Sequence, residues 1–595
     1  VCLYDGDGVI DFKFDAKVVS RSKNRVEFYF KPSYVNGCTA SYCNDNGIAL
    51  MILQTNINNP IHNIRVIMPG FENTYDSLPF HPFFLKNLQY YSTLRFMDWQ
   101  NINNNNEINW IDRNLPSYAS QSKGVSLEYM IELSNTIGSN PWFCIPHQAS
   151  NDYVLQFATM VKNNLRHDVE IYVEYSNEVW NGLFSQAIYA TQQGILRGLS
   201  NDQYIARYRF YSERSVEIFN IFRQVFQSSS RKIHYVLSGW TISTSATKEI
   251  LTWKNAYKYV THIGIAPYFD CNNLGSSQNA PHTALLSKDE IFKICNQTIK
   301  SSILPYLQNM KTLVSKYNLT LITYESGQSL VETNVMEYGN GETAGLTNLF
   351  ISVNQDPRMY DLYKLYIQTL MQINLIDQSR PLMHFSSCGI STKYGSWGAI
   401  EFTGQPINLT PKYRALIEIL SSYNKPRNIQ CESYLLSNSY INDRFLSLNS
   451  YTGYPVIISP RRMDTWLSEH SYFIQWMTDG ISNNEKVDII LHKVQNCIEK
   501  TTTTTSTSTT SPSINQNNSS PATIITNASA PSPPPPTSTS NNLKASSTTT
   551  QEDPDNDVWT QNQQQQLELG LKKYPASMDK AERWTKIASE VTGKS

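Results

Sequence analysis

The chain of 595 residues lacks several patterns that would assign it to a class at once. It has no Cys-x-x-Cys pair and no cluster of cysteine and histidine at zinc spacing, which argues against the common structural zinc sites. No apolar run reaches the roughly 20 residues that a transmembrane helix needs, so we expect no membrane-spanning segment. The formal net charge is −1, which gives no reason to expect nucleic acid or an anionic membrane as the partner of the main body.

The nine cysteines are scattered along the chain. Cys38 and Cys43 lie close together in a polar stretch, and Cys271 and Cys295 bracket another. For each pair two interpretations stay open, a disulfide in a secreted protein or two unpaired thiols. Two further cysteines stand in apolar, strand-like runs, where we expect small core residues: Cys144 and Cys388.

Six Asn-x-Ser/Thr triplets are compatible with a secreted protein. The first residue is Val1, already inside a strand-like run, so we expect the native N-terminus and any signal peptide on it to be missing. Together these features favour an extracellular or cell-surface location.

Apolar and aromatic residues are abundant, since 40% of the chain is hydrophobic, which is ample for a large buried core. From residue 62 a strand, a loop and a helix alternate. Eight such units predict an α/β fold, a parallel sheet closed into a (β/α)8 TIM barrel over residues 61–424. No glycine-rich phosphate turn follows the first strand, which disfavours an open doubly wound sheet. The expected strands are 63–68, 93–97, 142–146, 169–175, 233–238, 262–267, 319–324 and 382–386, and the clearest expected helices are 82–90, 126–137, 151–164, 203–227, 288–316, 357–375 and 411–422.

The rest of the chain divides by composition. Residues 1–60 read as short strands with Asp-Gly turns and predict a small N-terminal β-domain. Residues 425–500 are again β-rich, and SYFIQWMTDG with KVDIILHKV resembles the immunoglobulin-like sandwich modules of fungal and protist wall proteins. Residues 501–556, rich in Thr, Ser and Pro, cannot bury enough apolar surface to offset their ordering entropy and predict a disordered linker or a glycosylated stalk.

Residues 557–595 predict one helix, a turn and the start of a second helix. With Trp559 and Trp584 at the matching spacing, this partial segment resembles the Myb/SANT repeats of zuotin-type DnaJ proteins. A genuine SANT segment would make the protein a nuclear or ribosome-associated factor, located in the nucleus or cytoplasm. The other interpretation is a gene-model fusion, because a stalked extracellular protein and a SANT segment belong to different compartments.

Polar residues stand where the active site of such a barrel lies, at the C-terminal ends of the strands. Taken one at a time, each has an ordinary structural explanation. The two glutamates differ, because they directly follow the fourth and the seventh expected strand and would face each other across a closed barrel. The set consists of Arg95, His147, Asn177, Glu178, Tyr268, Glu325 and Trp397.

Two facing carboxyl groups fit glycoside hydrolysis. One carboxylic acid protonates the leaving oxygen, and the other, ionised, attacks or stabilises the anomeric carbon. A separation of about 5–5.5 Å gives a covalent intermediate and net retention. The acid must keep its proton at the working pH, so its pKa should lie above that of its partner. The sequence has no metal or nucleotide motif, and we expect no cofactor.

Two motifs carry a family resemblance. YVEYSNEVWNG (172–182) is similar to the strand-4 motif of clan A retaining glycoside hydrolases, and LTLITYESGQ (319–328) resembles their strand-7 nucleophile segment. The resemblance implies Glu178 as acid/base and Glu325 as nucleophile. It also implies supporting roles, with Asn177 binding the sugar 2-hydroxyl, Arg95 orienting the nucleophile, Tyr268 hydrogen-bonding it, His147 lining the sugar subsite and Trp397 forming an aromatic platform.

The motif departs from the family pattern at Val179-Trp180, where a proline usually follows Asn-Glu. Glu174 matches an inward-facing structural glutamate. The leading interpretation is a retaining O-glycosidase whose partner is a β-linked polysaccharide or oligosaccharide. The alternative is a glycan-binding or extracellular-matrix protein that uses the same barrel without turnover. The sequence determines neither the sugar nor the oligomeric state.

Overall fold

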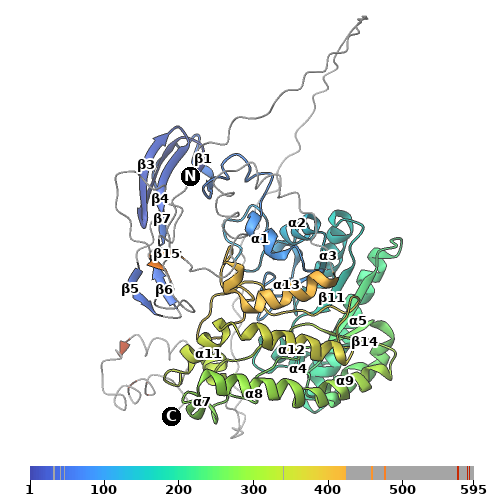
Figure 1. The fold of residues 1–595 in the computed structure, drawn as a ribbon. Helices are drawn as coiled ribbons and strands as arrows, with labels where there is room; N and C mark the ends of the chain where they lie inside the picture. Colours follow the sequence, from blue (N-terminus) through green and yellow to red (C-terminus); the bar gives the residue numbers. More distant parts are fainter. Residues whose placement is uncertain are drawn as a thin grey trace, which may run out of the picture. The chain divides into compact units, whose positions relative to one another are not determined.

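We describe the chain from a computed structural model, shown in Figure 1. The chain divides into two compact units, Val1–Lys486 and Val487–Ser595. The predicted linker, most of the predicted β-rich module and nearly all of the predicted SANT-like segment lie outside the described residues. The structure describes residues 1–30, 34–39, 42–45, 47–339, 341–423, 457–459 and 475–476, together with Lys573, Tyr574, Lys586 and Ser589.

The N-terminal region is antiparallel β-structure, as predicted. A four-stranded sheet has the order β3-β4-β1-β8, and two further pairs form, β2 with β7 and β5 with β6. Apolar side chains that alternate along the strands, among them Ile10, Phe12 and Val26, build a small core of their own. The strands are β1 (Cys2–Asp5), β2 (Gly8–Phe14), β3 (Ala16–Ser22), β4 (Arg25–Phe30), β5 (Tyr34–Thr39), β6 (Tyr42–Asp45), β7 (Ile48–Thr55) and β8 (His62–Val66).

A curled sheet of six parallel strands forms the centre of the following region, in the order β14-β13-β12-β11-β10-β9 (Figure 1). Every neighbour in the sheet is also a neighbour in sequence, as in part of a (β/α)8 barrel. The carboxyl ends of all six strands therefore lie at one rim. The strands are β9 (Thr93–Arg95), β10 (Asn140–Ile145), β11 (Ile171–Tyr175), β12 (Ile233–Ser238), β13 (His262–Ile265) and β14 (Thr320–Thr323).

Both faces of this sheet are covered, which explains why its strands are almost continuously apolar. Trp142 of β10, Tyr172 of β11 and Ile322 of β14 pack together on the concave face. Their immediate neighbours in sequence, such as Phe143 and Val173, belong to the large core against the helices. This alternation places the odd and even residues of each strand in two different cores, and it selects which side chains reach the interior of the curled sheet.

The helices lie on the outer face of the sheet, and all seven of the clearly expected ones are present. The expected helix at 288–316 is divided at Ser302-Ile303, because Pro305 is tolerated only in the first turn of a new helix. None of the described helices is long and apolar enough to span a bilayer. The helices are α1 (Pro82–Leu88), α2 (Leu127–Ile137), α3 (Asn151–Asn164), α4 (Ser185–Leu196), α5 (Gln203–Phe226), α6 (Thr244–Thr252), α7 (Ala280–Thr283), α8 (Lys288–Ser301), α9 (Leu304–Ser315), α10 (Thr333–Tyr338), α11 (Leu346–Gln355), α12 (Met359–Gln372) and α13 (Pro411–Tyr423).

Two of the eight predicted barrel strands differ from expectation. The segment at 63–68 is not a barrel strand, because β8 pairs antiparallel with β1 in the N-terminal sheet. The segment at 382–386 runs beside β14, but partly through side chains: Thr323 Oγ1 accepts from the backbone of Met383 at 2.9 Å, and Ser326 Oγ donates to its carbonyl at 2.8 Å. Regular strands thus form a half-barrel, and a closed eight-stranded barrel is not confirmed.

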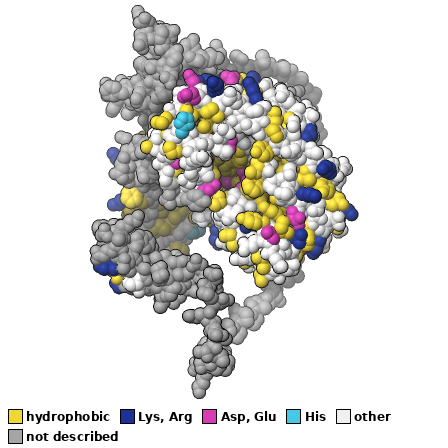
Figure 2. Space-filling model, turned by 90° about the horizontal axis from the view of Figure 1, so that it is seen from below, with side chains coloured by type: hydrophobic (Ala, Val, Ile, Leu, Met, Phe, Trp, Pro, Cys, Tyr) yellow, Lys and Arg dark blue, Asp and Glu magenta, His cyan; other side chains and the backbone are white. Residues whose placement is uncertain are grey.

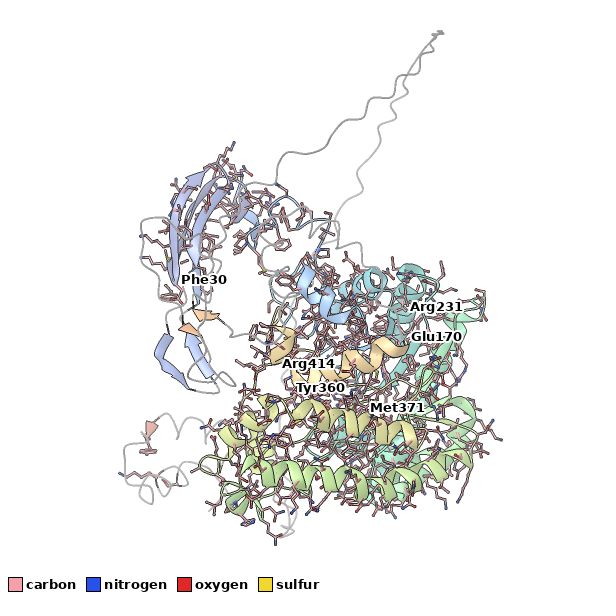
Figure 3. The ribbon with its side chains drawn as sticks, viewed as in Figure 1. Phe30, Glu170, Arg231, Tyr360, Met371 and Arg414 are labelled. Carbon is pink, nitrogen blue, oxygen red and sulfur yellow. A yellow bond between two sulfur atoms is a disulfide. The ribbon has the colours of Figure 1, made fainter. Side chains whose placement is uncertain are left out.

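Side-chain contacts join the outer helices to one another. Figure 3 labels Tyr360 of α12 and Arg414 of α13, whose guanidinium lies 4.8 Å from the tyrosine ring centroid. A disulfide joins Cys271, in the loop after β13, to Cys295 of α8, which decides between the two interpretations for this pair. The side chains of the other pair, Cys38 and Cys43, lie outside the described part of the chain. Cys144 is a buried thiol, as predicted, whereas Cys388 is exposed because the chain there has left the core.

The core between the sheet and α5 predicts a large stability effect. Phe222 is fully buried against Phe157 and Phe226, so Phe222→Ala should lower the free energy of unfolding by about 3–5 kcal/mol through lost burial and the cavity left behind. Leu285→Ala is the control, because this side chain is 83% exposed and its loss should be nearly neutral. Denaturant unfolding measures both, and similar midpoints for the two variants would contradict this packing.

Candidate active site

The two glutamates singled out in the sequence follow two strands that β12 and β13 separate in the parallel sheet, and short contacts link them. Glu178 follows β11 and Glu325 follows β14. Tyr324, the residue before Glu325, donates its hydroxyl to Glu178 Oε1 at 2.8 Å. Arg95 contacts Glu325 on one side and Asn177, the residue before Glu178, on the other. The curled sheet therefore brings both carboxyl groups into one site, although they are 147 positions apart in sequence.

Arg95, at the end of β9, is the cation around which this site is organised. Its Nη1 donates to Glu325 Oε1 at 2.8 Å, and its Nη2 donates to Asn177 Oδ1 and to Glu174 Oε2 at 2.9 Å each. The arginine side chain is only 6% exposed, so these charge-assisted bonds act in a medium of low polarity. Glu174 is completely buried and also accepts from Trp142 and Ser238, as expected of an inward-facing structural glutamate.

Glu325 is held from two sides. Besides Arg95, the hydroxyl of Tyr268 donates to its Oε2 at 2.9 Å, the two contacts that the sequence resemblance implied. Burial raises the pKa of Glu325 from 4.5 to about 8, against the lowering effect of the Arg95 charge, and the nearby charge of Glu178 raises it further. Glu325 and Glu178 titrate as one interacting pair.

Glu178 has a different environment, because its partners are neutral. Tyr324 donates to Oε1, and the amide of Asn181 donates to Oε2 at 3.0 Å. Burial raises the pKa of this carboxyl as well, and the two hydrogen bonds oppose the rise. Its backbone is in the left-handed region, with φ of 43°, and Ser176 has φ of 59°. Such strained conformations in residues other than glycine are typical of functional sites.

The other three predicted site residues differ in their distance from the two glutamates. Asn177 is buried within the site, between Arg95 and Asn103, to which its Nδ2 donates at 3.1 Å. Trp397 packs edge-on against Tyr268 at 5.7 Å and so stands next to Glu325. His147 instead packs against Tyr189 and contacts Gln148. Burial lowers its pKa to about 4, and its Nδ1 has no hydrogen-bond partner among the described residues.

Two partners of Glu178 were not predicted from the sequence. Tyr324 looked like an ordinary strand residue, and only the alternation of the seventh strand indicates that it faces the interior while its neighbour ends the strand. Asn181 is three positions after Glu178 in a turn, where an asparagine reaches a nearby carboxylate. A search for polar residues within three positions of each glutamate would have found both.

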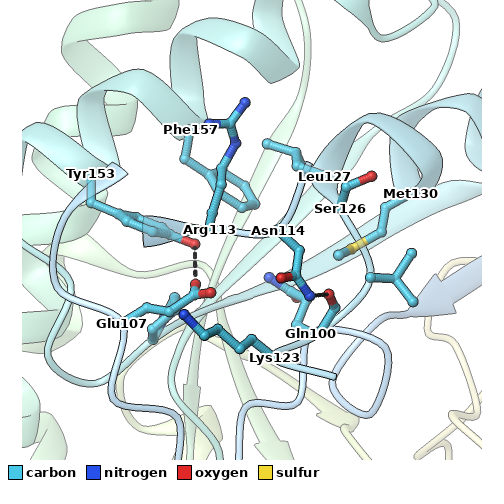
Figure 4. Close-up of a pocket in the computed structure, with 13 residues that line it drawn as sticks. Gln100, Glu107, Arg113, Asn114, Lys123, Ser126, Leu127, Met130, Tyr153 and Phe157 are labelled. Carbon is cyan, nitrogen blue, oxygen red and sulfur yellow. Dashed lines mark hydrogen bonds between the residues drawn. The ribbon is translucent and has the colours of Figure 1, made fainter. Parts of the chain in front are cut away.

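Two cavities lie near this site. The larger, 270 Å³, is lined by Arg95, Tyr324 and Glu325 and by apolar residues of α1, β9 and the 382–388 segment. It lies between β9 and the 382–388 segment, since both contribute lining residues. The smaller is only 30 Å³, about one water molecule, and is lined by Glu107, whose carboxylate accepts from Tyr153 at 3.1 Å (Figure 4). The smaller cavity is therefore no sugar site.

The surface charge offers no strong competing interpretation. On the face seen in Figure 2, Lys and Arg side chains are scattered among apolar and neutral ones rather than gathered in one basic patch. Within the part of the chain that the structure describes, no group of three or more His, Cys, Asp or Glu side chains is arranged to hold a metal ion. Among the described residues, the buried Glu325 and the partly buried Glu178 remain the clearest concentration of chemically active groups.

Comparisons with known proteins add little to this geometry. No protein-family model matches the chain, and no curated protein matches it in sequence. Among solved structures, the GH51 arabinofuranosidase from Xanthomonas axonopodis pv. citri is similar with 11% identity and a TM-score of 0.30, over 49% of this chain and 57% of that chain. This is a distant likeness to a glycoside hydrolase and carries neither a family nor a substrate to this chain.

The raised pKa of Glu325 predicts how stability depends on pH. The folded pair of Glu178 and Glu325 keeps a proton that the unfolded chain releases above about pH 4.5, so the free energy of unfolding should fall as the pH rises from there through about 8. The slope contributed by one proton is at most about 1.4 kcal/mol per pH unit. Glu325→Gln should flatten this part of the thermal-unfolding profile, whereas Glu342→Gln, at an exposed position, should retain it. An unchanged slope in Glu325→Gln would contradict a pair of glutamates that shares a proton in the folded protein.

Proposed function

We propose that the protein is a retaining O-glycoside hydrolase that acts on a β-linked polysaccharide or oligosaccharide. The observation that carries this proposal is the convergence of Glu178 and Glu325, which two different strands bring into one buried site around Arg95. Glycoside hydrolysis is a reaction that needs two such carboxyl groups in two different protonation states.

The partners of the two glutamates support an assignment of their roles. Arg95 and Tyr268 both donate to Glu325, and a cation at 2.8 Å favours the negative charge on that carboxyl. Burial raises the pKa of both carboxyls, so the pair keeps one proton between them. Glu178 receives only neutral donors, whereas the Arg95 charge opposes the rise in the pKa of Glu325, so we place the shared proton on Glu178. Glu178 is therefore the general acid and Glu325 the nucleophile, in agreement with the roles implied by the sequence motifs.

The reaction then proceeds by two displacements. The Glu325 carboxylate attacks the anomeric carbon while Glu178 gives its proton to the departing glycosidic oxygen, which leaves a sugar esterified to Glu325. Glu178, now ionised, takes a proton from water as the water attacks the anomeric carbon and releases Glu325. Asn177 would bind the 2-hydroxyl through the second hydrogen of its amide, and Trp397 would support the ring next to Tyr268. His147 would line the subsite in its neutral form.

Substitution of each glutamate should separate the two roles. Glu325→Gln should lower turnover of every substrate about 10³-fold or more, because no nucleophile remains. Glu178→Gln should do the same for oligosaccharides but slow the first step far less for aryl glycosides with a good leaving group, which need no protonation. Release of reducing ends and of nitrophenol from gluco-, xylo-, manno- and galacto-configured panels measures both.

Glu170→Gln is the matched control, because Glu170 lies at the other end of β11, away from the rim, and pairs with His234 and Lys232. It should keep wild-type activity. Incubation with 2-fluoro glycosides and peptide mapping should place the covalent label on Glu325. Glycan binding without turnover of any panel member would contradict the proposal and favour a binding protein. An active enzyme labelled at another residue would contradict the role of Glu325.

A further inference from the structure

A pair of tryptophans stands at the rim of the sheet beside the candidate acid. Trp180 follows β11 and Trp240 follows β12, and the two indole rings are stacked with centroids 5.3 Å apart and planes 8° from parallel. Trp180 is packed partly into the main core, whereas Trp240 is 39% exposed. Apolar neighbours from the same two loops, Leu183 and Ile242, are half exposed. Tryptophan is a costly residue to leave in water, and such exposed apolar groups commonly mark a binding surface.

The loops that carry the two rings are fixed by the protein. Thr241 Oγ1 donates to the carbonyl of Ala266 at 2.9 Å and accepts from its amide at 3.0 Å, which fastens the residue after Trp240 to the end of β13. The guanidinium of Arg207 donates to the carbonyl of Trp180 at 3.1 Å. A ligand that stacks on this pair would therefore find it already ordered, at a small entropic cost.

The position of the pair relative to Glu178 indicates which part of a ligand it would meet. Trp180 is two residues after Glu178, and Asn181 bonds to Glu178 through both its backbone amide and its side chain. A general acid must reach the glycosidic oxygen, so the leaving sugar lies on the Glu178 side of the site. Trp397 and Tyr268, in contrast, stand beside Glu325, where the sugar that becomes attached would lie.

We propose that Trp180 and Trp240 form a leaving-group subsite that stacks on the pyranose rings of the departing part of a β-linked glycan. The inference rests on the proposed function, since it needs Glu178 to be the acid. The flat, apolar face of a β-linked pyranose matches an exposed indole, and Trp180 supports Trp240 from behind. Because one indole face is exposed, the substrate class is an oligosaccharide or polysaccharide with at least one sugar beyond the cleavage point.

The test compares substrates with and without sugars on the leaving side. Trp240→Ala should lower kcat/KM for oligosaccharides about five- to tenfold more than kcat/KM for the aryl glycoside of the same sugar. The loss should come mainly from a higher KM, and its size corresponds to the free energy of one stacking contact. Trp240→Phe should restore most of the ratio, because a smaller ring still stacks. Tyr306→Ala, which removes a half-exposed aromatic from α9, is the matched control and should leave the ratio unchanged.

Binding to the Glu325→Gln background separates failure of this inference from failure of the proposed function. The ligands for the dissociation constant are cello- and laminari-oligosaccharides and their xylo- and manno-configured counterparts. If wild type cleaves oligosaccharides but Trp240→Ala changes neither the kcat/KM ratio nor this dissociation constant, the subsite is refuted and the proposed enzyme activity stands. If wild type cleaves no panel member, the proposed function fails and the leaving-group assignment fails with it. A weakened dissociation constant in Trp240→Ala, together with the shifted ratio, supports the subsite.

Discussion

The buried guanidinium of Arg95 is the constraint on which the rest of the site depends. It bonds at once to Glu174, Asn177 and Glu325, and these groups come from two separate places in the sequence, the end of β11 and the end of β14. A cation with 6% exposure is tolerated only with such complete pairing, because removing a charge from water costs several kcal/mol. The same pairing that makes its burial possible fixes the distance between the ends of β9, β11 and β14.

Arg95 contacts one glutamate with a structural role, Glu174, and one with a proposed catalytic role, Glu325. Glu174 is enclosed by Arg95, Trp142 and Ser238 and is inaccessible to any ligand. Glu325 shares the same cation but lies beyond the end of its strand, beside a cavity of 270 Å³. Glu174 and Glu325 thus share Arg95 as a partner but differ in exposure to a ligand, because they stand at different positions along their strands. Tyr268 and Tyr324 continue the same pattern, since each gives its hydroxyl to one carboxyl of the pair.

Most of the parallel region was predictable because its physical signals are local. Six apolar strands and the amphipathic helices between them follow from periodicity alone, and polar residues at strand ends indicate the rim. The predictions that were wrong or missing concern features that depend on contacts between distant parts of the chain or on side-chain direction. The segment at 63–68 has the composition of a barrel strand, but its pairing partner, β1, is decided by packing in the N-terminal sheet. Tyr324 and Asn181 were missed because their roles depend on which way a side chain points, and Cys388 was misplaced because an apolar run there leaves the core.

The interrupted wall between β9 and the 382–386 segment has a mechanical consequence. From β9 to β14 the rim is stiffened by ladders of backbone hydrogen bonds, but here the boundary is made by side chains of α1, β9 and the 382–388 segment around a cavity. Side-chain packing around a void yields more readily than a ladder, so thermal motion should concentrate on this flank. Arg95 lies on this flank. Heating should therefore weaken the contact between Arg95 and Glu325 before it disturbs the turn that contains Glu178.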